Sequence, residues 1–480
     1  MEIKPFEIKD WQNGMAQSCH LGFEEIRGLD VFTVPGEMTV NYKLANTSIS
    51  SSTPTAGIPA TPLQIINGAK VGSGTLDFWL ISLSGIWSGS SIKSGTFYHL
   101  CSYKKQLICS KSGYLSGYNG TTFYDDKIAI DGPDFMLSSL DDTLYISSGP
   151  ISNNRINKVY EKAGQTFNIN SSLTYTVELN VLVLPEDMNI VCMVDFGTYI
   201  AIACNSIYNY NKAYVYLWDG EATSASNRVV INGGNINAMI AKNNKLFCQV
   251  GNKGEWYISD GTSAEQFAKM PESFLTYSGA FNVYRNGLDF NEKGNIIFGI
   301  KQSTSGSNGL TPNGVFELNT ENGKISFSNV ATCGVGTSAD PTSIDCLCFD
   351  VFRSYTVGWS YNNATFGIDD SSTLRITSYS AFVASPFYQL GSSISDKVAK
   401  IKGFEIHLTK NLPTGCGLKM YYRTTQGGTW VAWGLKMTTD KSIFWQTTGL
   451  DSIRNIQFKL EVTTPSGSNA TPNILKIIIY

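Results

Sequence analysis

Short apolar segments separated by polar turns run along most of the chain. Between residues 65 and 375 these segments are rich in β-branched and aromatic side chains, as in 143–146, 199–203, 213–218 and 245–249. Brief segments of this kind, bounded by Gly, Asn, Asp and Ser, are typical of strands joined by tight turns. The pattern therefore predicts an all-β protein.

Turn signals recur at a nearly regular interval within this part of the chain. They are Ser84-Gly85, Asn119-Gly120-Thr121, Gly164-Gln165-Thr166, Asp219-Gly220, Asp260-Gly261-Thr262, Glu321-Asn322-Gly323 and Asp369-Asp370-Ser371. Their mean spacing of about 47 residues matches the roughly 40 to 50 residues of one propeller blade, which is a four-stranded meander. We therefore expect a β-propeller of about seven blades.

The pattern of apolar and polar residues changes near residue 395. Longer runs of alternating apolar and polar residues occupy 400–408, 417–423, 456–462 and 473–480. Alternation with a period of two predicts strands that are buried on one face only. Several antiparallel strands of this kind pack as a β-sandwich.

The predicted organisation has three parts. Residues 1–62 form an N-terminal segment that contains a strand and a Ser/Thr/Pro-rich loop, 63–394 form the β-propeller, and 395–480 form the C-terminal antiparallel β-sandwich. One helix is also expected, over residues 263–270, because this run combines good helix formers and is followed by Pro271.

Composition narrows the function classes. Charged residues make up 16% of the chain, below the roughly 25% of ordinary soluble domains. The net charge of −3 and the absence of a Lys/Arg cluster give no reason to expect direct nucleic-acid binding.

The longest apolar runs, 181–184 and 474–480, are far shorter than the roughly 18 residues of a membrane span. The N-terminus lacks the apolar core of a secretion signal, so we expect synthesis and folding in a cytoplasm.

Ten cysteines are scattered along the chain, several of them in apolar, strand-like surroundings. This distribution favours free, buried thiols. No paired Cys-x-x-Cys sets occur and there are three histidines, so the ligand pattern of a zinc site is missing. We therefore predict no metal and no cofactor.

The sequence contains few residues that are candidates for a catalytic role. His20, His99 and His407 are the only histidines, and none has a recognisable partner in the sequence. A glycosidase needs only two carboxylates, and the candidates for such a pair are Asp77, Asp126, Asp134, Asp195, Glu255 and Asp289. The sequence singles out none of them, and it contains no phosphate-binding Gly-Lys-Ser/Thr loop. We predict no catalytic residue.

Tryptophans near the C-terminus have two interpretations. Trp430, Trp433 and Trp445 could stack on sugar rings if they are exposed, or fill the core of the sandwich if they are not. The run 421–430 is similar to the Asp-box turn of sialidases and other propeller proteins, but Thr425 stands where the Asp would be. This run predicts a hairpin and not a catalytic signature.

Both ends of the chain resemble virion proteins of tailed bacteriophages. The likeness at the N-terminus is carried by Trp11-Gln12-Asn13-Gly14, Gly28-Leu29-Asp30-Val31, Pro35-Gly36 and Val40-Asn41-Tyr42, and at the C-terminus by Lys402-Gly403-Phe404, Tyr421-Tyr422-Arg423 and Gly428-Thr429-Trp430. In the resembled proteins a Trp/Gly-rich start precedes a propeller, and a sandwich ends the chain. With the blade pattern between them, the resemblance covers most of the sequence.

The resemblance implies a structural, non-catalytic component of a virion, on the tail in preference to the head. Such a protein would act as a rigid assembly platform or a subunit of the adsorption apparatus. It would contact other tail proteins, form a homo-oligomer in the virion, and be synthesised in the cytoplasm of the host bacterium. The alternative is a module that binds a glycan or receptor on the host surface, with a glycan depolymerase as a weaker third reading.

Overall fold

A computed structural model shows a chain built from strands and turns, with no α-helix among the residues that it describes. It describes residues 3–9, 11, 23, 25–27, 29–32, 36–40, 42–46, 62–71, 76–82, 84–88, 90–149, 153–209, 212–270, 281–302, 314–330, 343–349, 355–361, 365–375, 381–390, 398–425, 428–465 and 468–480. The all-β prediction is confirmed for this part of the chain.

Five antiparallel four-stranded sheets follow one another along the sequence, and in each the spatial order of strands is the chain order. The first two comprise β6 (Pro62–Lys70), β7 (Leu76–Ser82), β8 (Gly85–Ser88), β9 (Ser90–Ser94), β10 (His99–Tyr103), β11 (Gln106–Lys111), β12 (Tyr114–Tyr118) and β13 (Phe123–Ala129). The next two comprise β14 (Met136–Ser138), β15 (Leu144–Ser148), β16 (Arg155–Glu161), β17 (Tyr175–Val183), β18 (Met188–Phe196), β19 (Tyr199–Ser206), β20 (Lys212–Trp218) and β21 (Asn227–Asn232). The fifth comprises β22 (Ile236–Lys242), β23 (Lys245–Val250), β24 (Glu255–Ser259) and β25 (Ala264–Lys269).

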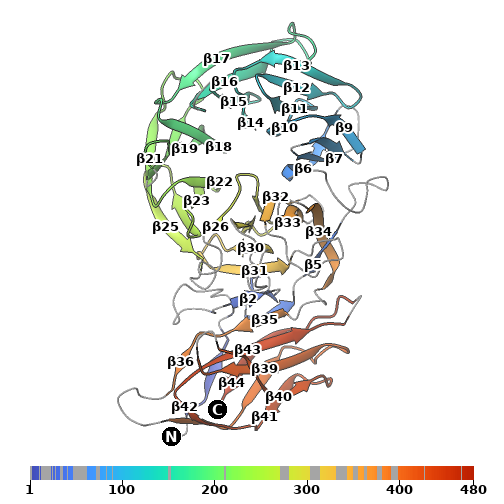
Figure 1. Ribbon diagram of the computed structural model, residues 1–480, viewed down its shortest axis with the longest axis vertical. Coiled ribbons are helices and arrows are strands. Elements are labelled where there is room, and N and C mark those ends of the chain that lie inside the picture. The colour runs from blue at the N-terminus through green and yellow to red at the C-terminus, as the bar shows by residue number, and fades with distance from the viewer. Residues whose placement is uncertain are drawn as a thin grey trace.

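Two larger sheets contain further four-stranded groups of the same kind. One group is β27 (Leu288–Phe290), β28 (Ile296–Gly299), β30 (Gly314–Leu318) and β31 (Ile325–Val330). The other is β32 (Ser343–Phe349), β33 (Tyr355–Tyr361), β34 (Thr365–Arg375) and β5 (Tyr42–Asn46), with β26 (Phe281–Asn282) and β29 (Lys301–Gln302) beside β32. Figure 1 shows these groups and the five sheets arranged around a common axis, which gives a propeller-like body.

Glycine in left-handed conformation marks the same turn in several sheets. Gly120, Gly164, Gly220, Gly261 and Gly323 all lie between the third and fourth strands of a group, with φ angles of 100°, 75°, 84°, 93° and 69°. Residues with a Cβ rarely adopt this conformation, so Gly is the residue that such turns favour. The turns predicted at these positions are confirmed.

Two local predictions are wrong. Asp369-Asp370-Ser371 lies inside β34 and not in a turn; the buried carboxylate of Asp369 accepts a hydrogen bond of 3.0 Å from the indole of Trp359, which holds it in the sheet. Residues 264–269, expected as a helix, form the outer strand β25 paired with β24. Pairing with a neighbouring strand has overridden the helix preference of Ala264, Glu265 and Gln266.

Two antiparallel sheets make up the C-terminal part. The first contains β1 (Phe6–Ile8), β44 (Ile474–Ile479), β38 (Phe404–Leu408) and β41 (Ile443–Gln446). The second contains β35 (Ala381–Ala384), β43 (Asn455–Thr463), β39 (Gly417–Arg423) and β40 (Val431–Met437), with β36 (Tyr388–Gln389) at its side and β37 (Ala399–Ile401) paired with β42 (Leu450–Ile453) nearby. Phe404 of the first sheet packs on Trp433 of the second, with ring centroids 4.6 Å apart. The sheets therefore face each other across an aromatic core.

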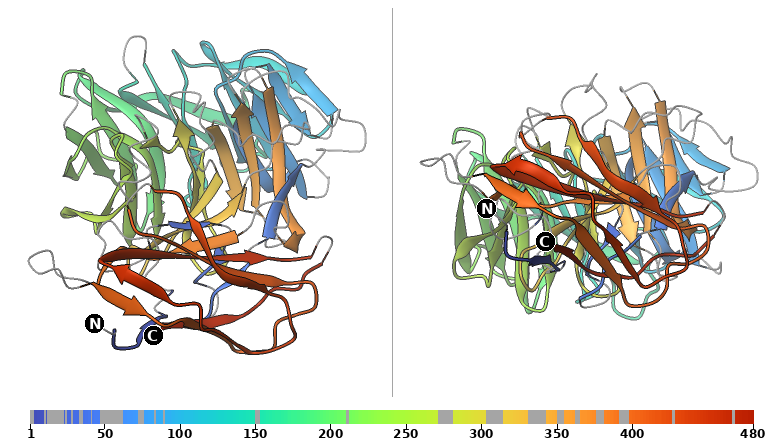
Figure 2. Two further views of the ribbon diagram at one scale, coloured as in Figure 1. Left: turned by 60° about the horizontal axis from the view of Figure 1, so that its bottom comes forward. Right: turned by 90° about the horizontal axis from the view of Figure 1, so that it is seen from below.

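Strands from the N-terminal segment join both bodies. β5 pairs with β34 of the propeller-like body, and β1 pairs with β44 of the C-terminal part. β2 (Glu25–Arg27) lies between them, parallel to β31 and antiparallel to β35, so one ten-stranded sheet runs from β27 to β40 (Figure 1). The short pair β3 (Leu29–Asp30) and β4 (Thr39–Val40) lies in the same segment. Figure 2 shows both ends of the chain at the C-terminal part. The predicted boundaries at 62 and 394 stay predictions.

Candidate functional site

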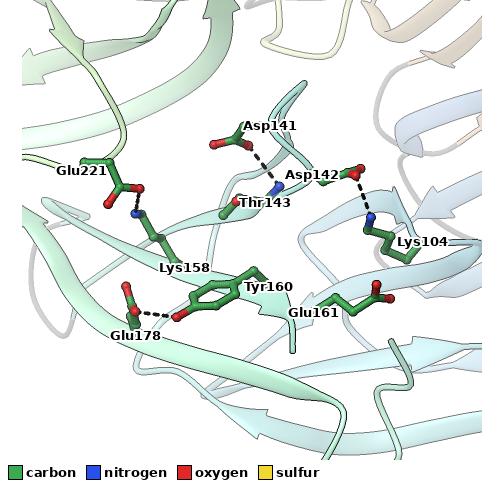
Figure 3. Close-up of a pocket in the computed structure, with 9 residues that line it drawn as sticks. All are labelled: Lys104, Asp141, Asp142, Thr143, Lys158, Tyr160, Glu161, Glu178 and Glu221. Carbon is green, nitrogen blue, oxygen red and sulfur yellow. Dashed lines mark hydrogen bonds and ion pairs between the residues drawn. The ribbon is translucent and has the colours of Figure 1, made fainter. Parts of the chain in front are cut away.

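Turns from three neighbouring sheets surround an open pocket of about 350 Å³ (Figure 3). Lys104 lies between β10 and β11, Asp141 and Asp142 lie between β14 and β15, and Glu221 lies between β20 and β21. Strands β16 and β17 supply the wall. The remaining lining residues are Thr143, Lys158, Tyr160, Glu161 and Glu178. With five carboxylates and two ammonium groups, the lining carries a negative charge.

Ion pairs hold both lysines of the pocket. Lys158 Nζ lies 2.8 Å from the carboxylate of Glu221, and Lys104 Nζ lies 2.8 Å from that of Asp142. The side chain of Lys158 is buried, and its ammonium also lies 5.8 Å from the centre of the Trp218 ring, within the range of a cation–π contact. Each lysine thus links two different sheets: Lys104 joins two turns, and Lys158 joins strand β16 to the turn that carries Glu221.

The other carboxylates accept hydrogen bonds from nearby donors. Tyr160 donates to Glu178 over 2.7 Å, and this bond raises the pKa of the Tyr160 phenol. Asp141 accepts bonds from the Tyr145 hydroxyl at 2.7 Å and the Thr143 N–H at 3.0 Å, while Glu161 accepts the Phe167 N–H at 2.6 Å. The pocket is therefore an open polar surface whose acids and hydroxyls can accept and donate hydrogen bonds to a hydroxyl-rich ligand.

A second cluster lies on another turn region of the propeller-like body. Arg285 makes a two-pronged ion pair with Asp134, at 2.7 and 2.8 Å, across 151 positions of sequence. Burial alone would raise the pKa of Asp134, but the hydrogen bonds and positive charge of Arg285 outweigh burial and lower it. The pair links the connection before β14 to the segment before β27, which belong to different sheets.

His99 is buried beside this ion pair. Its ring centre lies 4.3 Å from that of Phe135, and neither ring nitrogen has a hydrogen-bond partner of good geometry among the described residues. Burial, with the positive charge of Arg285, lowers the pKa of His99 to about 3. A neutral imidazole with so low a pKa is a poor general base near neutral pH. His407 contacts Glu405 at 2.9 Å, and His20 lies outside the described residues.

Three tryptophans predicted as sugar platforms or core residues have different environments. Trp433 is 1% exposed, stacks on Phe458 and donates its indole N–H to the Thr448 carbonyl at 2.7 Å. The prediction of Trp433 as a glycan platform is therefore wrong, because the core between the two C-terminal sheets covers this ring. Trp445 is 67% exposed on β41, and Trp430 is half-buried beside Arg423. Whether either of them binds a sugar stays a prediction.

The six carboxylates considered for a glycosidase do not line the pocket. Asp134 pairs with Arg285, Asp126 with Lys111 at 3.1 Å and Glu255 with Lys269 at 3.9 Å. Asp195 accepts a bond from Ser139, and Asp289 accepts the N–H groups of Phe290 and Phe349, while the side chain of Asp77 is outside the described residues. The pocket acids escaped sequence analysis because they come from turns and strands far apart in the chain.

Cysteines in the described part carry free thiols: Cys101, Cys109, Cys192, Cys204, Cys248, Cys346 and Cys416 are buried and Cys348 is half-buried. This confirms the free-thiol prediction for these eight; Cys19 and Cys333 lie outside the described residues. Burial raises the pKa of Cys101 and Cys192 to about 12, so both thiols are unreactive at neutral pH. The described part of the chain contains no group of three or more His, Cys, Asp and Glu side chains that could hold a metal ion, and no helix long and apolar enough to cross a membrane.

No family model and no curated protein matches the chain. Among solved structures, the computationally designed Ika8 protein is 10% identical, with a TM-score of 0.37 over 68% of this chain and 99% of the other. The N-terminal domain of Nup159 is 10% identical, with a TM-score of 0.40 over 72% and 98%. An exo-β-1,3-galactanase from Phanerochaete chrysosporium is 13% identical, with a TM-score of 0.27 over 92% and 100%. Likenesses this remote carry no argument about what the chain does.

Proposed function

We propose that the chain is a seven-bladed β-propeller joined to a C-terminal β-sandwich, and that it serves as a structural, non-catalytic component of a bacteriophage tail. In this proposal β5 is the outer strand of the last blade and closes the ring. Closure by a distant strand removes exposed sheet edges and makes the ring one rigid unit.

The observation that carries the proposal is the path of the N-terminal segment. β1, β2 and β5 belong to three different sheets, so a single short segment ties the propeller-like body to the C-terminal part. Trp11, within the stretch that resembles phage virion proteins, is buried and donates its indole N–H to the Leu475 carbonyl on β44 at 2.8 Å. A molecule whose two parts share hydrogen-bonded strands suits an assembly platform, because a force applied to the propeller-like body is transmitted to the C-terminal part through these strands.

Exposed apolar side chains offer a surface for neighbouring tail subunits. Leu435 and Trp445 are 77% and 67% exposed, and Val431 and Ile443 are about half exposed. All four lie on β40 and β41, which are edge strands of the two C-terminal sheets. Clustered apolar exposure of this kind marks protein contact surfaces.

Immunogold electron microscopy of purified phage particles tests the tail assignment. Antibody against this protein should label the tail, and label on the head would convert the proposal to capsid decoration. If neither immunogold labelling nor mass spectrometry detects the protein in purified particles, a role in the virion is overturned. A Leu435→Lys, Trp445→Glu double variant should enter particles at a tenth or less of the wild-type level, while Leu140→Lys, at an exposed turn far from β40, should enter normally.

A second candidate function is binding of a carbohydrate or receptor on the host surface. The open polar pocket and the two tryptophans outside the core favour it, since sugars are bound by polar side chains together with aromatic faces. A glycan array is the direct test, with binding above background expected. A depolymerase would in addition shorten capsular polysaccharide during incubation, which we do not expect.

A further inference from the structure

Four consecutive residues between β26 and β27, Val283 to Asn286, make hydrogen bonds to several different sheets of the propeller-like body. The first strands of these sheets lie around the common axis seen in Figure 1. They contact one another in the order β6 with β10, β10 with β14, β14 with β18, β18 with β22, β22 with β27, β27 with β32 and β32 with β6. We name residues 283–286 the axial strap.

Arg285 makes the central contacts of the axial strap. Its terminal nitrogens donate to the carboxylate of Asp134, just before β14, at 2.7 and 2.8 Å, and one of them also donates to the Val191 carbonyl on β18 at 3.4 Å. The guanidinium carbon lies 5.6 Å from the centre of the Phe135 ring, which is itself 4.3 Å from the ring centre of His99 on β10. One side chain therefore bonds to two sheets other than its own and, through Phe135, packs toward a third.

The other residues of the axial strap bond to three more sheets. The Val283 N–H donates to the side-chain oxygen of the fully buried Gln249 on β23 at 3.2 Å. The Asn286 side chain donates to the Leu63 carbonyl on β6 at 2.9 Å, and its backbone carbonyl accepts the N–H of Leu347 on β32 at 2.8 Å. The axial strap thus holds members of five sheets at once.

These bonds depend on one another because the residues that make them are adjacent in the chain. The ion pair of Arg285 and Asp134 is two-pronged, and its side chains are only 23% and 34% exposed, so water replaces its hydrogen bonds poorly when one partner moves. A displacement that breaks this pair also moves Val283 and Asn286 away from their partners. By contrast, a pair such as Lys158 and Glu221 joins two sheets only.

We propose that the axial strap is a conformational latch of the propeller-like body. While it is in place it holds the sheets together around the axis, and its release lets several sheets separate in one event, with the strands inside each sheet still paired. The inference concerns how this body opens. It goes beyond both proposed functions, since it applies equally to a tail component and to a glycan-binding module.

Buried cysteines report such an opening, because a buried thiol reacts only when the structure around it opens. Cys101, Cys192, Cys248 and Cys346 are buried in four different sheets, on β10, β18, β23 and β32. Cys416, buried just before β39, is the internal reference in the C-terminal part. Alkylation of the full chain with N-ethylmaleimide in native buffer, followed by mass spectrometry of each site, measures the five rates separately.

Variants of the axial strap test the latch. We expect Arg285→Met to raise the alkylation rates of the four cysteines in the propeller-like body at least tenfold and by a common factor, with less than a twofold change at Cys416. Asn286→Ala removes the side-chain bond to β6 alone, so it should raise the same four rates together by a smaller factor, and it keeps the test decisive if Arg285→Met does not fold.

Glu221→Gln is the matched control, because it neutralises the acid of an ion pair between two sheets away from the axial strap. All five rates should stay within twofold of the wild type, and circular dichroism checks that each variant is folded.

Three results would overturn the latch. Acceleration at Cys192 alone, next to Val191, would show that the sheets open separately. Equal acceleration at Cys416 would assign the effect to unfolding of the whole molecule. Unchanged rates in both variants would show that the axial strap does not control the opening.

Discussion

Two tryptophans three residues apart have opposite environments on one hairpin. Trp433 points into the core between the two C-terminal sheets and contacts Phe404, Tyr422 and Phe458. Trp430 instead lies beside two cations, Arg423 and Lys459. The same residue type therefore lies in the core at one position and at the partly exposed surface at the other.

Replacement of the buried Trp433 and of the exposed Trp445 should have different effects on stability. Trp433→Ala leaves a large cavity in the aromatic core, and we expect it to lower the free energy of unfolding by about 3–5 kcal/mol. Trp445→Ala removes an exposed ring and should change it by less than about 0.5 kcal/mol. Urea unfolding followed by fluorescence measures both; similar losses in the two variants would contradict the assigned environments.

His99 makes stability depend on pH. Its pKa is near 6.5 in the unfolded chain and about 3 in the folded protein, so between these values the unfolded chain binds a proton that the folded protein does not. The free energy of unfolding should therefore fall on acidification below pH 6.5, by up to about 1.4 kcal/mol per pH unit from this group. The lowered pKa of Asp134 acts in the same direction at lower pH.

Comparison of variants isolates this contribution. His99→Gln should flatten the pH dependence between pH 6.5 and 4 relative to the wild type, measured by denaturant titrations at each pH. Leu140→Gln, an exposed substitution that changes no titratable group, is the control and should keep the wild-type slope. Parallel curves for His99→Gln and the wild type would show that His99 is not held neutral.

At this scale the sequence could supply residue types but not environments. Three tryptophans were predicted as platform or core, and which of them is which depends on the direction that each strand presents to the core. The ion pair of Asp134 and Arg285 joins positions 151 residues apart, and no local pattern marks such a contact. The pocket acids are hidden for the same reason.

Among the elements, β5 has the most unusual position. It is separated from β34 by most of the chain, yet Leu44 pairs with Ser371 and Ala45 with Asp370 in regular antiparallel register. It is an edge strand, so only alternate N–H groups point toward β34. Neighbouring residues of β5 therefore differ in what they contribute.

Proline placed at these two neighbours provides an internal control. Proline lacks an N–H, so of Leu44→Pro and Ala45→Pro one removes a hydrogen bond to β34 and the other removes an N–H that faces away. We expect one variant to lose about 1–3 kcal/mol more than the other. Equal unfolding midpoints for the two, by thermal melting, would argue against the pairing of β5 with β34.

Elements made of local contacts were predictable, and elements made of distant contacts were not. Five turns between third and fourth strands followed from Gly beside Asn, Asp, Gln or Glu, since the turn geometry selects these residues. The alternation of apolar and polar residues could not predict which sheets β1, β2 and β5 join, because each is a short strand whose partner lies far along the chain. The helix expected over 263–270 failed because the outer strand has little burial to shape its sequence.

For the whole molecule, the ten-stranded sheet predicts cooperative unfolding. Strand β2 joins β31 to β35, and Ile26 at its centre is fully buried. We expect calorimetry to show one transition whose calorimetric and van't Hoff enthalpies agree. Ile26→Asp buries a charge at this join and should split the transition in two, whereas Asp451→Asn, at an exposed site on β42, should leave it single. Two transitions in the wild type would contradict a rigid union of the two bodies.

The path of the N-terminal segment also sets the order in which the molecule can be completed on the ribosome. β5 is synthesised long before its partner β34, which follows about 320 residues later, a wait of about 16 to 64 s at ribosomal elongation rates. β1 waits longer still, for β44 at the last residues of the chain. A prematurely terminated chain can form individual four-stranded sheets, but β1 and β5 then lack the strands with which they pair. Their unpaired edges would mark an unfinished protein to chaperones and proteases before it could reach an assembling particle.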